Sequence, residues 1–285
     1  MCPGPGAHYN HSMAGKPYDK LYIYELRGEA YADRELLGPA LVADWLESGY
    51  TFLFMSAPSQ AVVDQFAAQA GLEVRSETVI DYEDWEAGQE LRTVRAGRVL
   101  LCPTWDMQEP GPGQVRVAMD PGVAFGSGNH PTTNRCVRVL SDLFEKEQPR
   151  TVLDLGCGTG VLCSAALALG AERATAVDNQ RSTADTARRT LELNGVSDRS
   201  AVHHGDARLF AATPADLLCC NIFYSVIVDL IEIPELLQRP WLLFSGLFAK
   251  HIDEIHDKLN AKGLQTVEHF TDERWNTLLM RNTDF

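Results

Sequence analysis

The chain has 285 residues, of which 45% are hydrophobic, and its formal net charge is −14. This length and apolar content suit one large domain or two unequal ones, and no run of eighteen apolar residues predicts a helix that spans a membrane. The acidic balance argues against direct binding of nucleic acid, which needs a basic patch, and it is compatible with a basic protein substrate.

Residues 1–16 are rich in Gly, Pro and His and lack the apolar segment of a signal peptide, so they predict a disordered leader. The seven cysteines form no C-x-x-C pair and read as reduced thiols, which predicts a cytoplasmic protein without a disulfide framework. The eight histidines have no partners at metal-ligand spacing, and no metal site is predicted.

Residues 17–81 predict a small α+β domain. Its expected order is β-α-β-α-β, with strands at 20–27, 50–55 and 72–80 and helices at 39–47 and 58–70. Residues 82–98 are expected to be a linker. The acidic and aromatic segment 81–86 (DYEDWE) favours a connecting helix, and a role in contacting substrate stays open.

Residues 99–285 predict a second, larger domain. Strands are expected at 98–103 and 114–119, and a loop rich in Gly and Pro follows from Asp120. Thr132 and Thr133 are expected to cap a helix that runs to about Glu147. A loop this elaborate is more often functional than decorative.

The second half alternates between strands and helices, which predicts a mostly parallel, Rossmann-like sheet of seven strands with helices on both faces. The expected strands are 152–155, 174–178, 201–204, 216–221, 241–245, 264–270 and 276–281, the last two forming an antiparallel edge hairpin. The expected helices are 160–169, 182–194, 224–238 and 249–262.

The most informative motif is TVLDLGCGTG at residues 151–160, followed by Asp178 at the end of the next strand. A strand, a glycine turn into a helix and a second strand that ends on a carboxylate form a βαβ nucleotide site. The dinucleotide spacing G-x-G-x-x-G fails, because Val161 and Cys163 occupy the third glycine position in the two possible registers. The pattern D-x-G-x-G-x-G instead predicts S-adenosylmethionine, with Asp178 accepting hydrogen bonds from the ribose.

Five segments in order resemble one family: DPGVAFGSGNHPTT, VLDLGCGTGVL, AVD, LNGVSDR and CCNI. They are similar to PrmA, the bacterial lysine methyltransferases that modify large-subunit ribosomal protein eleven, over about residues 80–282. The tryptophans of DW at 84–85 and P-x-W at 103–105 also resemble that family's linker. The resemblance implies a class I S-adenosylmethionine-dependent methyltransferase with a small N-terminal α+β domain that recognises a protein substrate.

The resemblance also implies roles for individual residues. Around the cofactor it implies contacts from Thr133 and the Gly156 backbone, a turn shaped by Gly158, ribose binding by Asp178, adenine binding by Asp206 and packing by Phe125. Asn221 would face the methionine end of the cofactor and position the incoming amine, and no residue stands out as a dedicated base.

Two departures bear on the substrate. The loop reads GSGNHPTT where the family usually has GTGTHPTT, and the first eighty residues share few motifs with it. Methylation of another protein or of a small amine therefore stays an alternative, as does a non-catalytic module that binds the cofactor. Asn221-Ile222-Phe223-Tyr224 lacks the two prolines of N-P-P-Y, which disfavours a DNA adenine or glutamine target.

Overall fold

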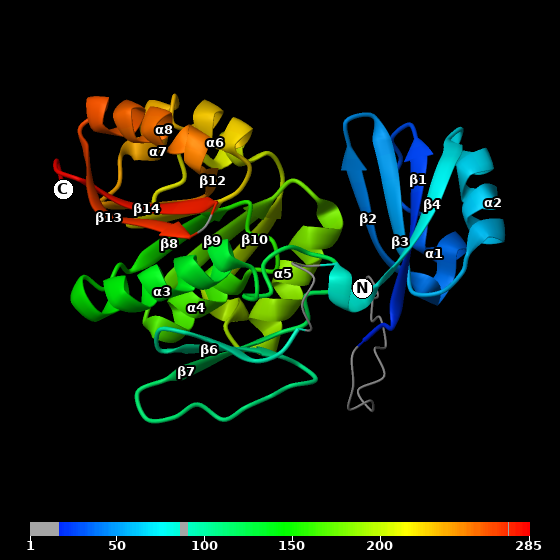
Figure 1. Ribbon diagram of the computed structural model, residues 1–285, viewed down its shortest axis with the longest axis horizontal. Coiled ribbons are helices and arrows are strands. Elements are labelled where there is room, and N and C mark those ends of the chain that lie inside the picture. The colour runs from blue at the N-terminus through cyan, green and yellow to red at the C-terminus, as the bar shows by residue number, and fades with distance from the viewer. Residues whose placement is uncertain (1–16, 86–90, 273) are drawn as a thin grey trace.

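The structure is a computed structural model that describes residues 17–85, 91–272 and 274–285 (Figure 1). The leader predicted at 1–16 lies outside the described residues. The described residues form a four-stranded, a three-stranded and a seven-stranded sheet. The four-stranded sheet lies at one end of the molecule, and the other two sheets share the larger body (Figure 1).

The N-terminal sheet has the element order β-α-β-β-α-β, the order of the ferredoxin-like motif. Its elements are β1 (Lys20–Arg27), α1 (Arg34–Leu37), β2 (Leu41–Glu47), β3 (Tyr50–Met55), α2 (Gln60–Ala70) and β4 (Glu73–Asp81). The strands pair in the order β2-β3-β1-β4, and all three pairings are antiparallel. One face of the sheet packs against α1 and α2 through buried residues such as Leu53 and Phe66.

The helix predicted at 39–47 is wrong, because this segment is strand β2 after a short 3-10 turn at Gly38–Ala40. The run LVADWL contains apolar residues at both helical and strand spacing, and pairing with β3 decides between them. Ser48 and Gly49 join the two strands with φ of 53° and 85°, as a two-residue hairpin turn requires. The Ser-Gly pair is the turn signal that the sequence offers here.

A short connection leads to the three-stranded sheet of β5 (Val94–Ala96), β6 (Val99–Pro103) and β7 (Val115–Met119). The connecting helix predicted at 81–86 is reduced to one 3-10 turn at Tyr82–Asp84, and Glu86 lies outside the described residues. Tyr82 is buried in a cluster with residues of the N-terminal sheet such as Leu21 and Phe54.

The seven-stranded sheet confirms the predicted fold class. Its strands are β8 (Thr151–Leu155), β9 (Arg173–Asp178), β10 (Ser200–His204), β11 (Leu217–Asn221), β12 (Trp241–Phe248), β13 (Leu264–Asp272) and β14 (Trp275–Asn282). Their order is β10-β9-β8-β11-β12-β14-β13, and β14 is antiparallel to both of its neighbours. The predicted hairpin of the last two strands therefore forms one edge of an otherwise parallel sheet.

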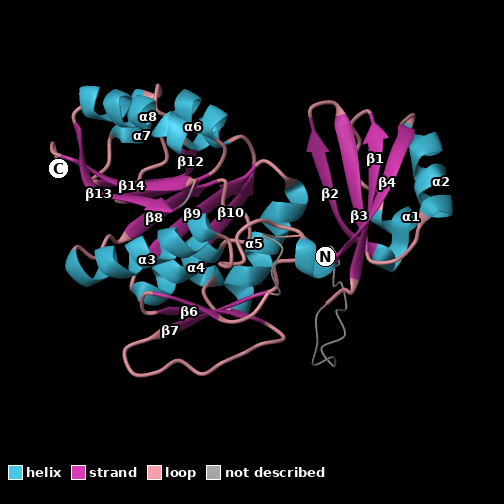
Figure 2. Ribbon diagram, viewed as in Figure 1, coloured by secondary structure: helices cyan, strands magenta, loops and turns pink. Residues whose placement is uncertain are grey.

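Helices cover both faces of this sheet (Figures 1 and 2). One face carries α3 (Pro131–Lys146), α4 (Val161–Leu169) and α5 (Arg181–Leu193), and the other carries α6 (Tyr224–Leu230), α7 (Pro234–Leu237) and α8 (Ala249–Ala261). The continuous helix predicted at 224–238 is wrong, because it is divided into α6 and α7. Pro234 begins the second helix, since proline fits the first turn of a helix and disrupts its interior.

Helix α3 begins slightly earlier than predicted. Its N-cap is His130, whose side chain accepts a hydrogen bond from the backbone N–H of Thr132, and Pro131 occupies the first turn. Thr132 and Thr133 lie inside the helix and are buried. Proline is common at this first helical position, so Pro131 is the usable signal for the cap.

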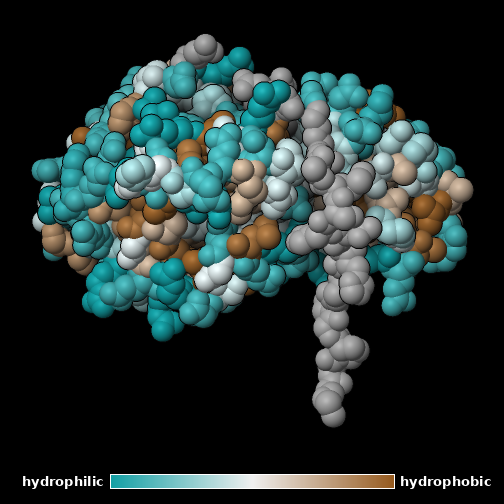
Figure 3. Space-filling model, turned by 90° about the horizontal axis from the view of Figure 1, so that it is seen from below, coloured by the Kyte–Doolittle hydropathy of each residue, from teal (hydrophilic) through white to brown (hydrophobic). Residues whose placement is uncertain are grey.

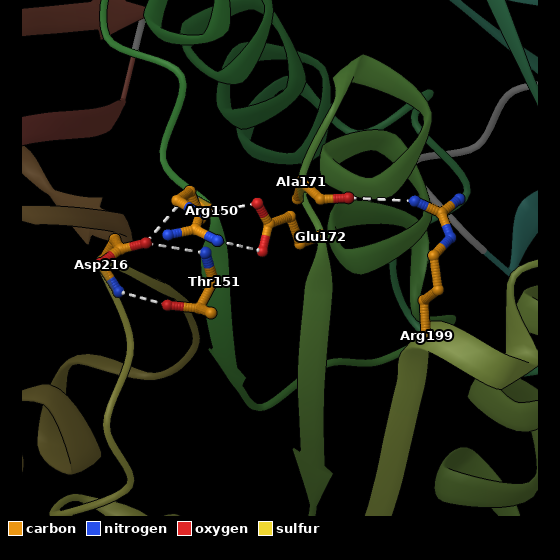
Figure 4. Close-up of polar contacts among 6 residues, drawn as sticks. All are labelled: Arg150, Thr151, Ala171, Glu172, Arg199 and Asp216. Carbon is orange, nitrogen blue, oxygen red and sulfur yellow. Dashed lines mark hydrogen bonds and ion pairs between the residues drawn. The ribbon is translucent and has the colours of Figure 1, made fainter.

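Hydrogen bonds and an ion pair connect the amino ends of the central strands (Figure 4). Ligands of open α/β sheets bind at the opposite, carboxyl ends. The Asp216 carboxylate accepts hydrogen bonds from the backbone N–H groups of Arg150 and Thr151 at 2.8 and 2.9 Å. The Arg150 guanidinium pairs with Glu172, and Arg199 donates to the carbonyl of Ala171. These contacts tie strands together and lie away from the carboxyl ends.

The edge strand β2 contacts the amino end of α5. The side-chain amide of Gln180 accepts a hydrogen bond from the N–H of Leu46 at 3.1 Å and donates one to the carbonyl of Leu46 at 2.9 Å. The Ser182 hydroxyl donates to the carbonyl of Asp44 at 2.7 Å. The N-terminal sheet is thus joined to the larger body by hydrogen bonds between residues that lie 134 and 138 positions apart in the chain.

The face of the molecule seen in Figure 3 is mostly hydrophilic, with hydrophobic residues in small separate patches. Within the described part of the chain, no helix is long and apolar enough to cross a membrane. The six cysteines in the described residues are free, and all of them are buried.

Candidate functional site

The predicted cofactor loop lies at the carboxyl end of β8 and turns into α4. Gly156, Gly158 and Gly160 all have positive φ, at 77°, 54° and 77°, a region that side chains with a Cβ rarely adopt. The backbone N–H of Gly156 donates to the carbonyl of Val177 at 2.8 Å, which joins the loop to β9. The local sequence thus folds as the glycine pattern predicts.

The glycines also make room for other parts of the protein, which the sequence did not predict. A Cβ on Gly156 would lie 1.9 Å from Cγ2 of Ile222, and a Cβ on Gly158 would lie 2.2 Å from the carbonyl oxygen of Phe125. The residue that follows β11 and the loop before α3 therefore pack directly on the glycine turn.

This packing gives one test. Gly156→Ala is expected to lower the free energy of unfolding by about 2–4 kcal/mol, because it adds a clash with Ile222 to the cost of a positive φ. Gly113→Ala is a matched control, since Gly113 has φ of 74° and a Cβ there would meet no heavy atom within 4 Å. Urea denaturation of both variants measures the difference, and equal losses would contradict the role of Ile222.

Asp178 ends β9 beside this turn and is 8% exposed. Its carboxylate accepts hydrogen bonds from the N–H of Gly158 at 3.0 Å and from the N–H of Gln180 at 3.0 Å. Burial raises the pKa of Asp178, while these two hydrogen bonds and the nearby His204 act in the opposite direction. Each carboxylate oxygen keeps acceptor capacity after one hydrogen bond, which fits the diol of a ribose.

The loop between β7 and α3 is fastened to the same turn. The carbonyl of Phe125 accepts a hydrogen bond from the N–H of Thr159 at 2.9 Å, and the carbonyl of Gly126 accepts one from the Thr159 hydroxyl at 2.7 Å. The ring of Phe125 packs edge-on against His130, and the residue is 41% exposed. Phe125 therefore borders the glycine turn, and its packing against a cofactor stays a prediction.

Asn221 ends β11 on the other side of β8. Its side-chain nitrogen donates a long hydrogen bond of 3.5 Å to the hydroxyl of Thr133, which is buried on α3. This contact leaves the amide oxygen of Asn221 as the acceptor. A Cβ at Gly246 would lie 2.6 Å from the carbonyl oxygen of Ile222, so this glycine makes room for the residue that follows Asn221.

Asp206 differs from the other predicted site residues. It is exposed, caps a 3-10 turn by accepting from the N–H of Arg208, and forms an ion pair with the Arg208 guanidinium at 2.9 Å. Arg208 also pairs with Asp229. These contacts direct Asp206 toward its own turn and α6, and its adenine role stays a prediction.

Three residues near this edge of the sheet were not predicted as part of the site. His130 packs against the Trp275 ring at 5.2 Å, and burial lowers the pKa of His130. Trp275 in turn stacks on Phe248 at 4.4 Å. An aromatic wall thus continues from Phe125 to the ends of β12 and β14, and no periodic signal in the sequence indicates it.

Asp154, the first residue of the glycine motif, is fully buried inside the sheet. Apart from the nearby Cys163 thiol, which is a weak donor, its carboxylate oxygens have no hydrogen-bond partner among the described residues. Burial, and to a smaller extent the charge of Asp178, raises the pKa of Asp154 to about 7. No group of three or more His, Cys, Asp or Glu in the described ranges is arranged to hold a metal ion.

The sheet is mostly parallel, and its antiparallel strand β14 lies next to the edge strand β13. A glycine turn follows β8, and an acidic residue ends β9. Together these features define a class I methyltransferase fold. The family model described as ribosomal protein L11 methyltransferase (PrmA) matches residues 53–283. The chain belongs to this family.

Several relatives and a solved structure agree with this assignment. Ribosomal protein L11 methyltransferases from Gloeobacter violaceus and Alkaliphilus metalliredigens are 30% and 29% identical to the chain, over 91% and 89% of its length and 81% of theirs. The match to that of Thermosynechococcus vestitus is 34% identical but spans only 58% of each chain. The crystal structure of a ribosomal protein L11 methylase from Lactobacillus delbrueckii subsp. bulgaricus aligns with a TM-score of 0.58 and 27% identity, covering 67% of this chain and 98% of that one.

Proposed function

We propose that this chain is an S-adenosylmethionine-dependent methyltransferase that methylates a lysine amine of a basic protein in the cytoplasm, with ribosomal protein L11 as the first candidate substrate. Family membership supports methyl transfer, and the names of the relatives support the candidate. In this proposal residues 17–81 recognise the substrate and residues 99–285 bind the cofactor. Residues 82–98 connect the two, and their strand β5 pairs with β6 of the larger body.

The cofactor, when bound, supplies a methyl group on a sulfonium. Asp178 would hold the ribose, the backbone at Gly156 and Gly158 would border the methionine and ribose parts, and Phe125 and Thr133 would close the site. Methyl transfer of this kind depends mainly on holding donor and acceptor in line, which contributes on the order of 7–11 kcal/mol. In this proposal these residues therefore position the cofactor and the amine, and none of them acts as a nucleophile.

The arrangement of Asn221 carries the lysine assignment. Because its nitrogen donates to Thr133, its oxygen is left to accept an N–H of an incoming amine and to orient the amine lone pair. The amine must first lose a proton, which costs roughly 4–5 kcal/mol at pH 7 for an unperturbed lysine. A carboxylate in this position would stabilise the ammonium form, whereas the uncharged amide oxygen accepts from the amine without adding to that cost.

Asn221→Ala is expected to lower kcat by about tenfold to a hundredfold while the Kd for S-adenosylhomocysteine changes little, because the variant loses positioning of the amine. Thr133→Val keeps the shape of Thr133 and removes the acceptor for the Asn221 nitrogen, so it should produce a smaller loss of kcat. Single-turnover transfer of radiolabelled methyl groups measures the effect. A normal kcat for Asn221→Ala would refute the role.

The substrate is tested by radiolabelled transfer to purified ribosomal protein L11, with a whole lysate as comparison and mass spectrometry to locate the modified residues. Labelled lysines in L11 would support the proposal. Label on another protein would favour a different substrate, an alternative motivated by the family match, which begins at residue 53 and leaves β1 and β2 outside. Absence of any transfer would overturn methyltransferase activity.

A further inference from the structure

The acidic and aromatic segment after β4 contacts the loop that precedes α3. In Figure 1 this segment is the cyan turn between the N-terminal sheet and the larger body. Tyr82 is 2% exposed and belongs to a buried cluster with Phe54 of the sheet and Val123 of the loop. Trp85 packs against Phe54 and Trp45 with ring centroids 5.0 and 5.4 Å away.

Two hydrogen bonds extend from this segment to consecutive carbonyls of the loop. The Tyr82 hydroxyl donates to the carbonyl of Gly122 at 2.7 Å, and the indole N–H of Trp85 donates to the carbonyl of Val123 at 3.0 Å. The bonds span 40 and 38 residues of chain. Their acceptors lie just before Phe125 in the same loop.

The same loop is held from its other side by the glycine turn. The carbonyls of Phe125 and Gly126 accept hydrogen bonds from Thr159, directly after Gly158. The carbonyls of 122 and 123 are thus fixed by the linker, and those of 125 and 126 by the cofactor loop. Moving the first pair would displace the second, because only Ala124 separates them.

We infer that Tyr82 and Trp85 are positioning residues for the cofactor site: they hold Gly122 and Val123 so that Phe125 and Gly126 stay seated on the glycine turn. The inference rests on the proposed function, since it assumes that this turn binds S-adenosylmethionine. It gives the acidic and aromatic segment a role in cofactor affinity rather than in direct contact with substrate.

Both hydrogen bonds act on the loop backbone, so their effect should appear in binding rather than in chemistry. Loss of one hydrogen bond frees a loop carbonyl and allows conformations in which the loop leaves the turn. The cofactor would then bind only those molecules in which the loop lies against the glycine turn. The apparent Kd rises as the fraction of molecules in that conformation falls.

The variants Tyr82→Phe and Trp85→Phe each remove one donor and keep an aromatic ring in the cluster. The Kd for S-adenosylhomocysteine, measured by calorimetry on the full chain, is expected to rise about threefold to tenfold for each. The KM for S-adenosylmethionine should rise in parallel, with kcat at saturating cofactor within about twofold of the starting protein.

Two control variants replace a ring of the same kind away from this cluster. Tyr24→Phe removes a hydroxyl that donates to Glu77 and accepts from the N–H of Ser59. Trp241→Phe changes an indole at the start of β12, where the strand pairs with the amino end of β11, at the opposite end of the sheet from the cofactor loop. The controls are expected to lower Tm without changing the Kd.

The outcomes separate the inference from the proposed function. If Tyr82→Phe and Trp85→Phe lower Tm but keep the Kd within about twofold, their role is structural and the inference is overturned. If the controls weaken binding as much as the test variants, a general loss of stability explains the result and the inference is also overturned. If the unmodified chain binds neither cofactor form, the proposed function fails instead.

Discussion

Asp178→Asn is expected to weaken binding of S-adenosylhomocysteine by about a hundredfold or more. Both carboxylate oxygens of Asp178 accept backbone hydrogen bonds, from Gly158 and from Gln180. The asparagine amide oxygen can accept only one of them, so its nitrogen sets a donor against the other N–H and also removes an acceptor for the ribose. Two hydrogen bonds from the ribose hydroxyls to a charged carboxylate contribute about 3 kcal/mol or more together, which corresponds to this loss.

Calorimetry on the purified chain measures the change. Asp198→Asn is a matched control, since it removes the same charge from an exposed 3-10 turn. Circular dichroism and Tm should show that the Asp178 variant is folded at the temperature of the titration. Unchanged affinity in that folded variant would refute the ribose assignment.

Asp154→Asn is expected to change how stability depends on pH. Burial raises the pKa of Asp154 to about 7, against an ordinary value of 3.8 in the unfolded chain. Between these values the native state holds a proton that the unfolded state releases, so stability falls as pH rises from about 4 to about 7. Above pH 7 the loss of stability from ionising Asp154 stays constant. At about 1.36 kcal/mol for each unit of pKa difference, this loss is on the order of 4 kcal/mol.

The asparagine variant is neutral at every pH and should escape this loss. Its free energy of unfolding minus that of the starting protein is expected to increase between about pH 4 and pH 7 and to level off above that range. Urea denaturation at a series of pH values measures the difference. A difference that is flat over this range would mean that Asp154 is not protonated in the native state.

Much of the larger domain could be predicted from the sequence because its signals are local. The glycine motif between an apolar strand and a helix predicts the backbone conformation of the turn. The position of Asp178 could be predicted because this residue ends the next strand. The structure places Asp178 within hydrogen-bond distance of Gly158 and joins Asn221 to Thr133. Asp206 also follows a strand, but its ion pair with Arg208 depends on side-chain conformations that the strand pattern does not contain.

The remaining features depend on contacts between distant segments. The sequence LVADWL suits both a helix and a strand, and only pairing with β3 makes it strand β2. The hydrogen bonds from Tyr82 and Trp85 to the loop before α3, and from Gln180 to Leu46, join residues whose proximity no local pattern contains. The buried environment of Asp154 likewise follows from packing on both faces of the sheet.

The contact between Gln180 and β2 has a consequence for self-association. An edge strand presents backbone N–H and C=O groups that another chain can pair with, and proteins commonly shield such edges. Gln180 and Ser182 occupy backbone groups of β2 at Asp44 and Leu46, where a neighbouring strand would bind. The side chains at the start of α5 therefore take the place of a further strand, and separation of the N-terminal sheet from the larger body would expose a template for β-sheet addition between molecules.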